Sequence, residues 1–83
     1  MDETKIYDST VFKDARIGVC LDEVIKILAE KGYDPINQLV GYLMSGDPGY
    51  ISNYKNARKK ILQYNRSELL DFLLKEYINK WDI

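Results

Sequence analysis

The chain has 83 residues, with 12 lysines and arginines, 13 aspartates and glutamates, one cysteine and no histidine. This length corresponds to one domain, and the formal net charge of −1 argues against strong, non-specific binding to nucleic acid or another polyanion. A zinc site and a Ser-His-Asp or Cys-His catalytic centre need residues that the chain lacks, so we expect no enzyme, no cofactor and no metal ion.

Cys20 and the hydropathy of the chain bear on its location. A single cysteine cannot form a disulfide framework within one chain, and Cys20 lies in the apolar run IGVCL, where we expect it to be buried. No apolar stretch reaches the roughly 18 residues of a membrane-spanning helix, and the N-terminus does not resemble a signal peptide. We therefore expect a soluble cytoplasmic protein that does not insert into membranes.

The N-terminal part, residues 1–14, is predicted to be a flexible regulatory tail, and residues 15–83 are predicted to form a single helical domain. Residues 15–20 are compatible with a strand, a helix extension or a loop. From there on, apolar residues recur at the spacing of a helix, at Leu21, Val24, Ile25 and Leu28. A glycine at position 32 marks the expected end of this first helix.

The second helix has the clearest boundaries in the sequence. Asp34 and Pro35 are typical of an N-cap and a first helical residue, and Gly46 is typical of the position after a helix end. These signals predict a helix over about residues 35–45, where Gly41 allows the close approach of another segment. Its expected buried side carries Ile36, Leu39, Val40 and Leu43. The amides of this helix, Asn37 and Gln38, are expected to be exposed.

Two further helical segments complete the predicted bundle. The third spans about residues 48–63, with a possible break near Ser52, and carries an apolar stripe made of Tyr50, Tyr54, Ala57, Ile61 and Tyr64. The fourth spans about residues 66–80 and is capped by Asn65 or Ser67. It is predicted to be the most amphipathic of the four, with Leu69, Leu70, Leu73, Leu74, Tyr77, Ile78 and Trp81 on its apolar side.

The expected fold class is therefore all-α, a compact bundle of about four helices. Hydrophobic residues make up 46% of the chain, which is more than one small core is expected to hide, so we also expect a homodimer. Leu73 is predicted to be buried, and Leu73→Ala would then cost about 2–5 kcal/mol of unfolding free energy.

Basic residues are concentrated between Pro48 and Ser67, where no acid occurs. The remaining residues carry seven positive and thirteen negative charges, a balance of −6. This pattern is typical either of a solvated helix face or of a surface that holds an acidic partner or a phosphate. A planar guanidinium can donate two parallel hydrogen bonds to such a group. The candidate partner-binding residues are therefore Arg58 and Arg66, with Lys55 and Lys59 beside them.

Hydroxyl side chains near the N-terminus are candidates for phosphorylation. Thr4 follows two acids, and Ser9 and Thr10 are comparable positions in the expected tail. A phosphate adds about −1.5 to −2 charges at neutral pH. Such a charge would compete for the basic surface or repel an acidic partner, which amounts to a phosphorylation switch.

An alternative hypothesis is a small nucleic-acid-binding protein. The second and third predicted helices, joined by a short glycine-containing turn, resemble the outline of a helix-turn-helix motif, and the later helix is basic. The negative total charge and the lack of a flanking basic arm argue against it.

The segments KGYDPINQLVGYLMSGDPGYI and YKNARKKI resemble the signature of the IreB/ReoM family, small regulators in Gram-positive Firmicutes. The resemblance is dense over residues 31–58 and continues more loosely through NRSELLDFLLKEYI. The matching positions of the first segment are Gly32, Tyr33, Pro35, Asn37, Gln38, Gly41, Tyr42, Ser45, Gly46, Asp47 and Pro48.

The resemblance implies an α-helical homodimer without catalytic activity. It implies a substrate of a membrane Ser/Thr kinase, with Thr4 in DETKIY at the position of the modified threonine. It further implies control of peptidoglycan precursor synthesis, and hence of tolerance to wall-active antibiotics, through Clp-protease turnover of a biosynthetic enzyme. Arg58 and Arg66 match arginines that are important to relatives, whereas Asn53 and Leu62 stand where relatives have arginine.

Overall fold

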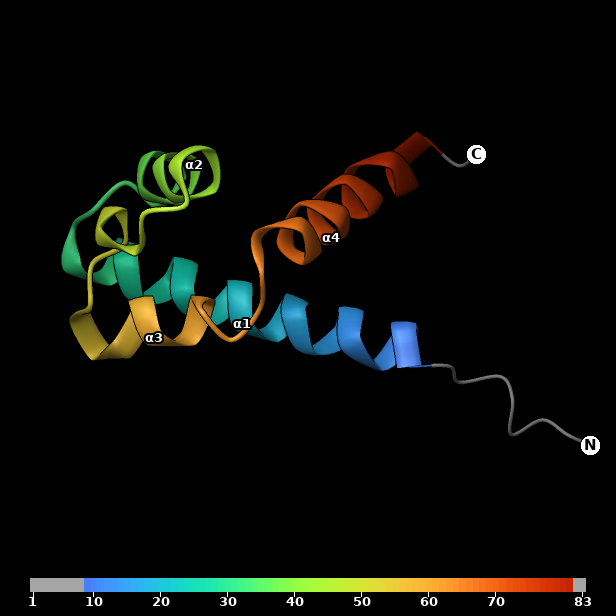
Figure 1. Cartoon of the computed structure of the whole chain (residues 1–83), viewed down its shortest axis with the longest axis horizontal. Coiled ribbons are helices and arrows are strands. Elements are labelled where there is room, and N and C mark those ends of the chain that lie inside the picture. Colours follow the sequence, from blue (N-terminus) through green and yellow to red (C-terminus); the bar gives the residue numbers. More distant parts are fainter. Residues whose placement is uncertain (1–8, 82–83) are drawn as a thin grey trace, which may run out of the picture.

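The computed structural model describes residues 9–81, and every regular element among them is helical. Four α-helices follow in order, α1 (Ser9–Lys31), α2 (Pro35–Ser45), α3 (Ala57–Ile61) and α4 (Arg66–Ile78). Three 3₁₀ turns lie between and after them, η2 (Pro48–Tyr50), η3 (Tyr54–Asn56) and η4 (Asn79–Trp81). Figure 1 shows α2, α3 and α4 arranged around α1. The predicted all-α class is therefore confirmed.

Helix α1 begins much earlier than the sequence suggested. The expected boundary after residue 14 is wrong, because residues 9–14 belong to the first turns of α1. The open alternatives for residues 15–20 are also settled, since this segment is the middle of α1. Gly18 is tolerated there because a mid-helix glycine costs only about 1 kcal/mol, while the adjacent Ile17 and Cys20 are buried. The rest of the expected tail, including Thr4, lies outside the described residues.

Helix α2 follows its sequence signals residue by residue. The Asp34 carboxylate accepts hydrogen bonds from the backbone N–H groups of Ile36 (3.0 Å) and Asn37 (3.4 Å), so it caps the first turn. At the other end Gly46 has a φ of 78°, and its N–H donates to the Tyr42 carbonyl at 2.7 Å. The left-handed conformation explains why a glycine ends this helix.

The predicted third segment over 48–63 is broken near Ser52, as the sequence allowed, but it is not a long helix, because it consists of two short 3₁₀ turns and a helix of five residues. Lys55 and Asn56 have positive φ values of 48° and 65°, which interrupt any continuous helix. Such a conformation is unfavourable for most side chains, but asparagine tolerates it well. The apolar end of the stripe behaves as expected, since Ala57 and Ile61 are fully buried against α1.

Helix α4 begins with the cap that the sequence suggested. The Asn65 side chain accepts a hydrogen bond from the Glu68 N–H, and the Glu68 side chain accepts one from the Asn65 N–H. This reciprocal pair is a capping box. The hydrophobic core lies where the middle of α1 meets the other segments. Its buried members are Ile17, Cys20, Leu21, Val24, Leu28, Tyr42, Ile51, Ala57, Ile61 and Leu69.

Most of the apolar side of α4 does not reach this core. Leu69 is buried and Phe72 packs against the core, but α4 then diverges from α1 (Figure 1). Leu73, expected to be buried, is 39% exposed, so that expectation is wrong. On α2, Ile36 and Val40 also face outward, and Tyr42 takes the buried place instead. The molecule is elongated, with extents of 48 × 26 × 23 Å, and its long axis follows α1 (Figure 1).

Candidate partner-binding site

Arg58 and Arg66 both donate to backbone carbonyls, Arg58 in the segment that links α2 to α3 and Arg66 in the last turn of α2. Arg58 Nε donates to the Ile51 carbonyl at 2.9 Å, and Arg66 Nη1 donates to the Leu43 carbonyl at 3.1 Å. The Arg58 guanidinium therefore holds the linking segment, and the Arg66 guanidinium holds the end of α2. An arginine side chain has five N–H donors, so each of the two guanidinium groups keeps N–H groups that can donate to a carboxylate or a phosphate. The residues proposed for recognition thus also have a structural role.

The Arg66 guanidinium lies directly against Gly46. A Cβ atom built at Gly46 would lie 2.8 Å from Arg66 Cζ, which is closer than real Cβ contacts. Position 46 therefore favours glycine for its left-handed backbone conformation, and a larger residue would also displace the end of the Arg66 side chain. The arginine also places its positive charge at the C-terminal end of α2, where the helix dipole favours a cation.

The lysines of the basic segment are in part neutralised by acids of α1. Lys55 Nζ lies 3.2 Å from the Glu30 carboxylate, and Lys60 Nζ lies 3.7 Å from that of Glu23. The hydrogen bond to Glu30 raises the pKa of Lys55. By contrast, Lys59 is exposed and forms no ion pair with another described residue. The basic segment is therefore less isolated from acidic residues in the folded protein than it is along the sequence.

The positions of the family signature mostly shape the corner between α2 and η2. The Gln38 side chain accepts a hydrogen bond from the Ser52 N–H at 2.9 Å, so its expected exposure is wrong. Ser45 Oγ donates to the Gly41 carbonyl at 2.7 Å and accepts from the Asp47 N–H at 3.0 Å. Asp47 in turn accepts from the N–H of Gly49 at 2.8 Å. This corner supplies the carbonyls that the two arginines hold.

Most of the remaining signature residues lie at the ends of helices, and Tyr33 and Asn37 among them are exposed. Gly32 has a φ of 95° at the end of α1, and the N–H of Tyr33 donates to the Leu28 carbonyl at 2.9 Å, which closes that helix. Pro35 and Pro48 are first helical residues after their caps. Asn37 is exposed, as expected, and Tyr33 is 41% exposed.

Thr10, predicted as a phosphorylation site, lies exposed in the first turn of α1. It borders a cleft of about 440 Å³ between α1 and the start of α4. This cleft could not be predicted from periodicity in the sequence, because it depends on how two distant helices meet. Its only sequence signal was the capping pattern of Asn65 and Glu68. The lining residues are Thr10, Lys13, Asp14, Ile17, Ser67, Glu68 and Asp71.

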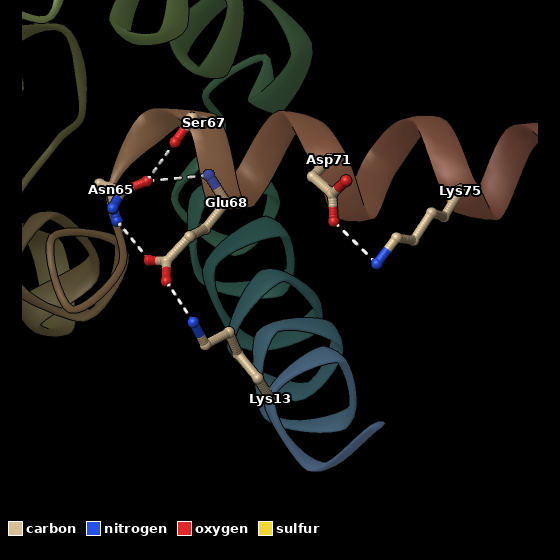
Figure 2. Close-up of polar contacts among 6 residues, drawn as sticks. All are labelled: Lys13, Asn65, Ser67, Glu68, Asp71 and Lys75. Atoms are coloured by element: carbon tan, nitrogen blue, oxygen red, sulfur yellow. Dashed lines mark hydrogen bonds and ion pairs between the residues drawn. The ribbon is translucent and has the colours of Figure 1, made fainter. Parts of the chain in front are cut away.

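Ion pairs connect α1 and α4 across this cleft. Lys13 Nζ lies 2.7 Å from Glu68 (Figure 2), and Lys75 Nζ lies 3.2 Å from Asp14 and 2.8 Å from Asp71. The Lys13 ammonium, and then the hydrogen bond from the Asn65 amide, lower the pKa of Glu68. The stability that Glu68 contributes is therefore present above the ordinary pKa of a glutamate and is lost as the pH falls through its lowered pKa.

Cys20 behaves as a small hydrophobic residue, as the sequence suggested. It is 6% exposed, and its thiol donates to the Lys60 carbonyl at 3.3 Å. Burial raises the pKa of the Cys20 thiol, which keeps it protonated. Among residues 9–81, no helix is both long and apolar enough to cross a membrane, and no group of three acids, cysteines or histidines is placed to hold a metal ion.

The alternative hypothesis of a helix-turn-helix protein required a long basic helix after the turn, and the structure does not contain one among the described residues. The basic helix expected after the turn has only five residues, Ala57–Ile61. In addition, Lys55 and Lys60 are paired with acids of α1. A recognition helix needs enough length to present several side chains to a groove.

Comparisons with known proteins agree with the resemblance seen in the sequence. The model of the IreB regulatory phosphoprotein family matches residues 2–79. A UPF0297 protein of Clostridioides difficile (strain 630) is 41% identical over 80 residues, which cover 96% of this chain and 94% of that protein.

Proposed function

The chain belongs to the IreB family of regulatory phosphoproteins, and from this premise we propose a non-enzymatic regulator whose contacts with a partner are controlled by phosphorylation. In this proposal a membrane Ser/Thr kinase modifies the protein in the cytoplasm. The unmodified form promotes Clp-dependent turnover of an enzyme of peptidoglycan precursor synthesis. Phosphorylation relieves this effect and thereby changes tolerance to wall-active antibiotics. The family and the sequence resemblance support this assignment.

The observation that carries the proposal is the pair of arginines at the link between α2 and α3. Each guanidinium donates to one backbone carbonyl, Arg58 to that of Ile51 and Arg66 to that of Leu43, so both planes are held in place. A fixed guanidinium loses less side-chain entropy when it binds a carboxylate than a mobile one does. Lys59 adds an exposed charge next to Arg58 on α3. This arrangement suits an acidic segment of a partner protein.

The proposal includes a homodimer. Helix α2 exposes Ile36, Val40 and Met44, which are spaced by four residues and are 73%, 50% and 80% exposed. A hollow of about 230 Å³, lined by Val40, Leu43, Met44 and Leu70, continues this apolar surface to α4. Further along α4, Leu74 is 60% exposed. An apolar surface that spans two helices supports a second copy as its cover.

The partner surface is best tested with Lys59→Glu rather than with the arginines. Arg58→Ala and Arg66→Ala would also release the linking segment and the end of α2, so a loss of binding would have two explanations. Lys59→Glu reverses an exposed charge and leaves every described hydrogen bond in place. We expect capture of the Clp machinery and its substrate enzyme from lysate to fall several-fold, as measured by affinity purification and mass spectrometry.

Lys26→Glu is the matched control, since Lys26 is an exposed lysine of α1 without an ion pair to another described residue. It should capture as much as the unaltered protein. Treatment of the unaltered protein with the cognate kinase and ATP should also reduce capture. If Lys59→Glu and the kinase both leave capture unchanged, the proposed charge-controlled regulator is wrong.

A further inference from the structure

The Glu68 carboxylate joins two parts of the molecule at once. Glu68 Oε1 accepts the Asn65 N–H at 3.0 Å and completes the cap of α4, while Glu68 Oε2 binds Lys13 of α1 at 2.7 Å (Figure 2). Asn65 Oδ1 also accepts a hydrogen bond from Ser67 Oγ at 2.7 Å. At the start of α4, this ion pair therefore adds to the packing of the buried Leu69.

Thr10 lies three residues before this lysine and borders the same cleft. On a helix, side chains at positions i and i+3 are neighbours, with Cβ atoms about 5–6 Å apart. The Thr10 side chain is exposed, and the structure assigns it no hydrogen bond to another described residue. The first turn of α1 contains no acidic residue, so the positive end of the helix dipole is available to a negative group there.

We propose that Thr10 is a phosphorylation site whose phosphate draws Lys13 away from Glu68 and thereby removes one of the contacts that join the first turn of α4 to α1. This inference rests on the proposed function, because it specifies how phosphorylation acts. A kinase transfers the γ-phosphoryl group of a nucleoside triphosphate to Thr10 Oγ1. The new P–O bond replaces the bond from the γ-phosphorus to the nucleoside diphosphate, which leaves, and the hydroxyl proton passes to solvent.

The charges around the cleft explain why Lys13 would change partner. The charged groups that line the cleft are Lys13 and Asp14 from α1, and Glu68 and Asp71 from α4, with Lys75 of α4 beside them. Lys75 is already shared between Asp14 and Asp71. A phosphate with about −1.5 to −2 charges offers Lys13 a stronger partner than a carboxylate, without crossing between helices. The three nearby carboxylates are meanwhile repelled by the added charge.

Loss of the contact between Lys13 and Glu68 would reach the candidate partner-binding site, because Glu68 and Arg66 lie in the same first turn of α4. Arg66 holds the Leu43 carbonyl and packs against Gly46. A shift of this turn therefore changes how the guanidinium is held. Through this connection, a modification near the N-terminus of α1 acts on a distant binding surface without contact to the partner.

The test uses the full 83-residue chain prepared by chemical synthesis, with and without a phosphate on Thr10, so that it does not depend on any kinase. NMR titration follows the Glu68 carboxylate by its ¹³C signal and the phosphate by its ³¹P signal. We expect phosphorylation to raise the pKa of Glu68 towards its ordinary value. We also expect a lower second pKa of the phosphate in the unaltered chain than in the phosphorylated Lys13→Gln chain.

Lys26→Gln serves as the control, because Lys26 lies on α1 but does not line the cleft. It should leave the phosphate pKa where it is in the unaltered chain. The inference is overturned if Lys13→Gln and Lys26→Gln give the same phosphate pKa, or if phosphorylation leaves the pKa of Glu68 unchanged. Either result concerns only the Thr10 switch, whereas the lysate capture with Lys59→Glu decides the proposed function separately.

Discussion

At the scale of single residues, two mid-helix glycines each face an aromatic side chain, and the effect of an added methyl group depends on which part of that side chain it meets. Gly41 in α2 faces the Tyr50 ring near its point of attachment, with Cγ 2.9 Å from a built Cβ. Gly18 in α1 faces Phe72 at the far end of its ring, with Cζ at 3.1 Å. The ring of Phe72 can tilt away from a methyl group, whereas the base of the Tyr50 side chain is fixed by its backbone.

This difference predicts opposite signs for two identical substitutions. Gly18→Ala gains up to about 1 kcal/mol of helix propensity and should leave the unfolding free energy unchanged or raise it. Gly41→Ala gains the same propensity, but overpacking against Tyr50 costs about 1–3 kcal/mol, so a net loss is expected. Urea denaturation of the two variants beside the unaltered protein measures both effects. Equal stabilities of the two variants would show that Tyr50 moves freely.

At the scale of elements, α4 is anchored at one end only. Leu69 in its first turn is 1% exposed, but the side chains further along the helix become exposed as it leaves α1. The ion pairs of Lys13 and Lys75 span the same region where the two helices are still close. Exposed pairs of this kind contribute about 0–1 kcal/mol each, so Leu69 and Phe72 supply most of the anchor. The apolar residues of α4 therefore form two surfaces, one near Leu69 that packs in the core and one further along the helix that is exposed.

Alanine substitutions along α4 should follow this division. Leu69→Ala is expected to cost about 2–5 kcal/mol, the usual range for a buried leucine. Leu73→Ala, at 39% exposure in one copy, should cost clearly less when the protein is dilute. Denaturation at several protein concentrations separates folding from self-association. A cost for Leu73→Ala equal to that of Leu69→Ala at the lowest concentration would contradict the single-ended anchor.

At the scale of the whole molecule, α2 and α4 carry an exposed apolar surface that the core does not explain. Val40, Met44 and Leu70 meet at one hollow, and Leu74 and Tyr77 are also exposed on α4. Soluble monomers rarely leave large contiguous apolar patches in contact with water. The elongated shape leaves these helices accessible to a second copy.

A charged residue within this surface should therefore weaken the dimer. Leu74→Arg places an unpaired charge where the second copy is proposed to lie, and a rise in the dimer dissociation constant of at least tenfold, about 1.4 kcal/mol, is expected. Leu62→Arg is the control, because Leu62 is 45% exposed but lies at the end of α3. Analytical ultracentrifugation measures both. Equal dissociation constants for the two variants would place the dimer contact elsewhere.

Features governed by near neighbours in the chain were predictable from the sequence. The bounds of α2 and the cap of α4 follow from Asp34, Gly46 and Asn65, whose side chains or backbone act within four residues. The candidate residues Arg58 and Arg66 could be chosen from residue type and resemblance. Their hydrogen bonds to the Ile51 and Leu43 carbonyls could not be predicted, because the folded structure decides which carbonyls lie within reach of each arginine.

The amino-acid order by itself determined the helical class, three of the helix boundaries named above and the burial of Cys20, since these depend on local backbone preference and on hydropathy. Only the tertiary structure decided which apolar side chains reach the core, which lysines meet the acids of α1, and that Thr10 shares a cleft with Glu68. Those outcomes depend on how α3 packs against α1 and on the angle at which α4 leaves α1. Contacts between residues more than fifty positions apart set that angle, and no periodicity along the chain encodes it.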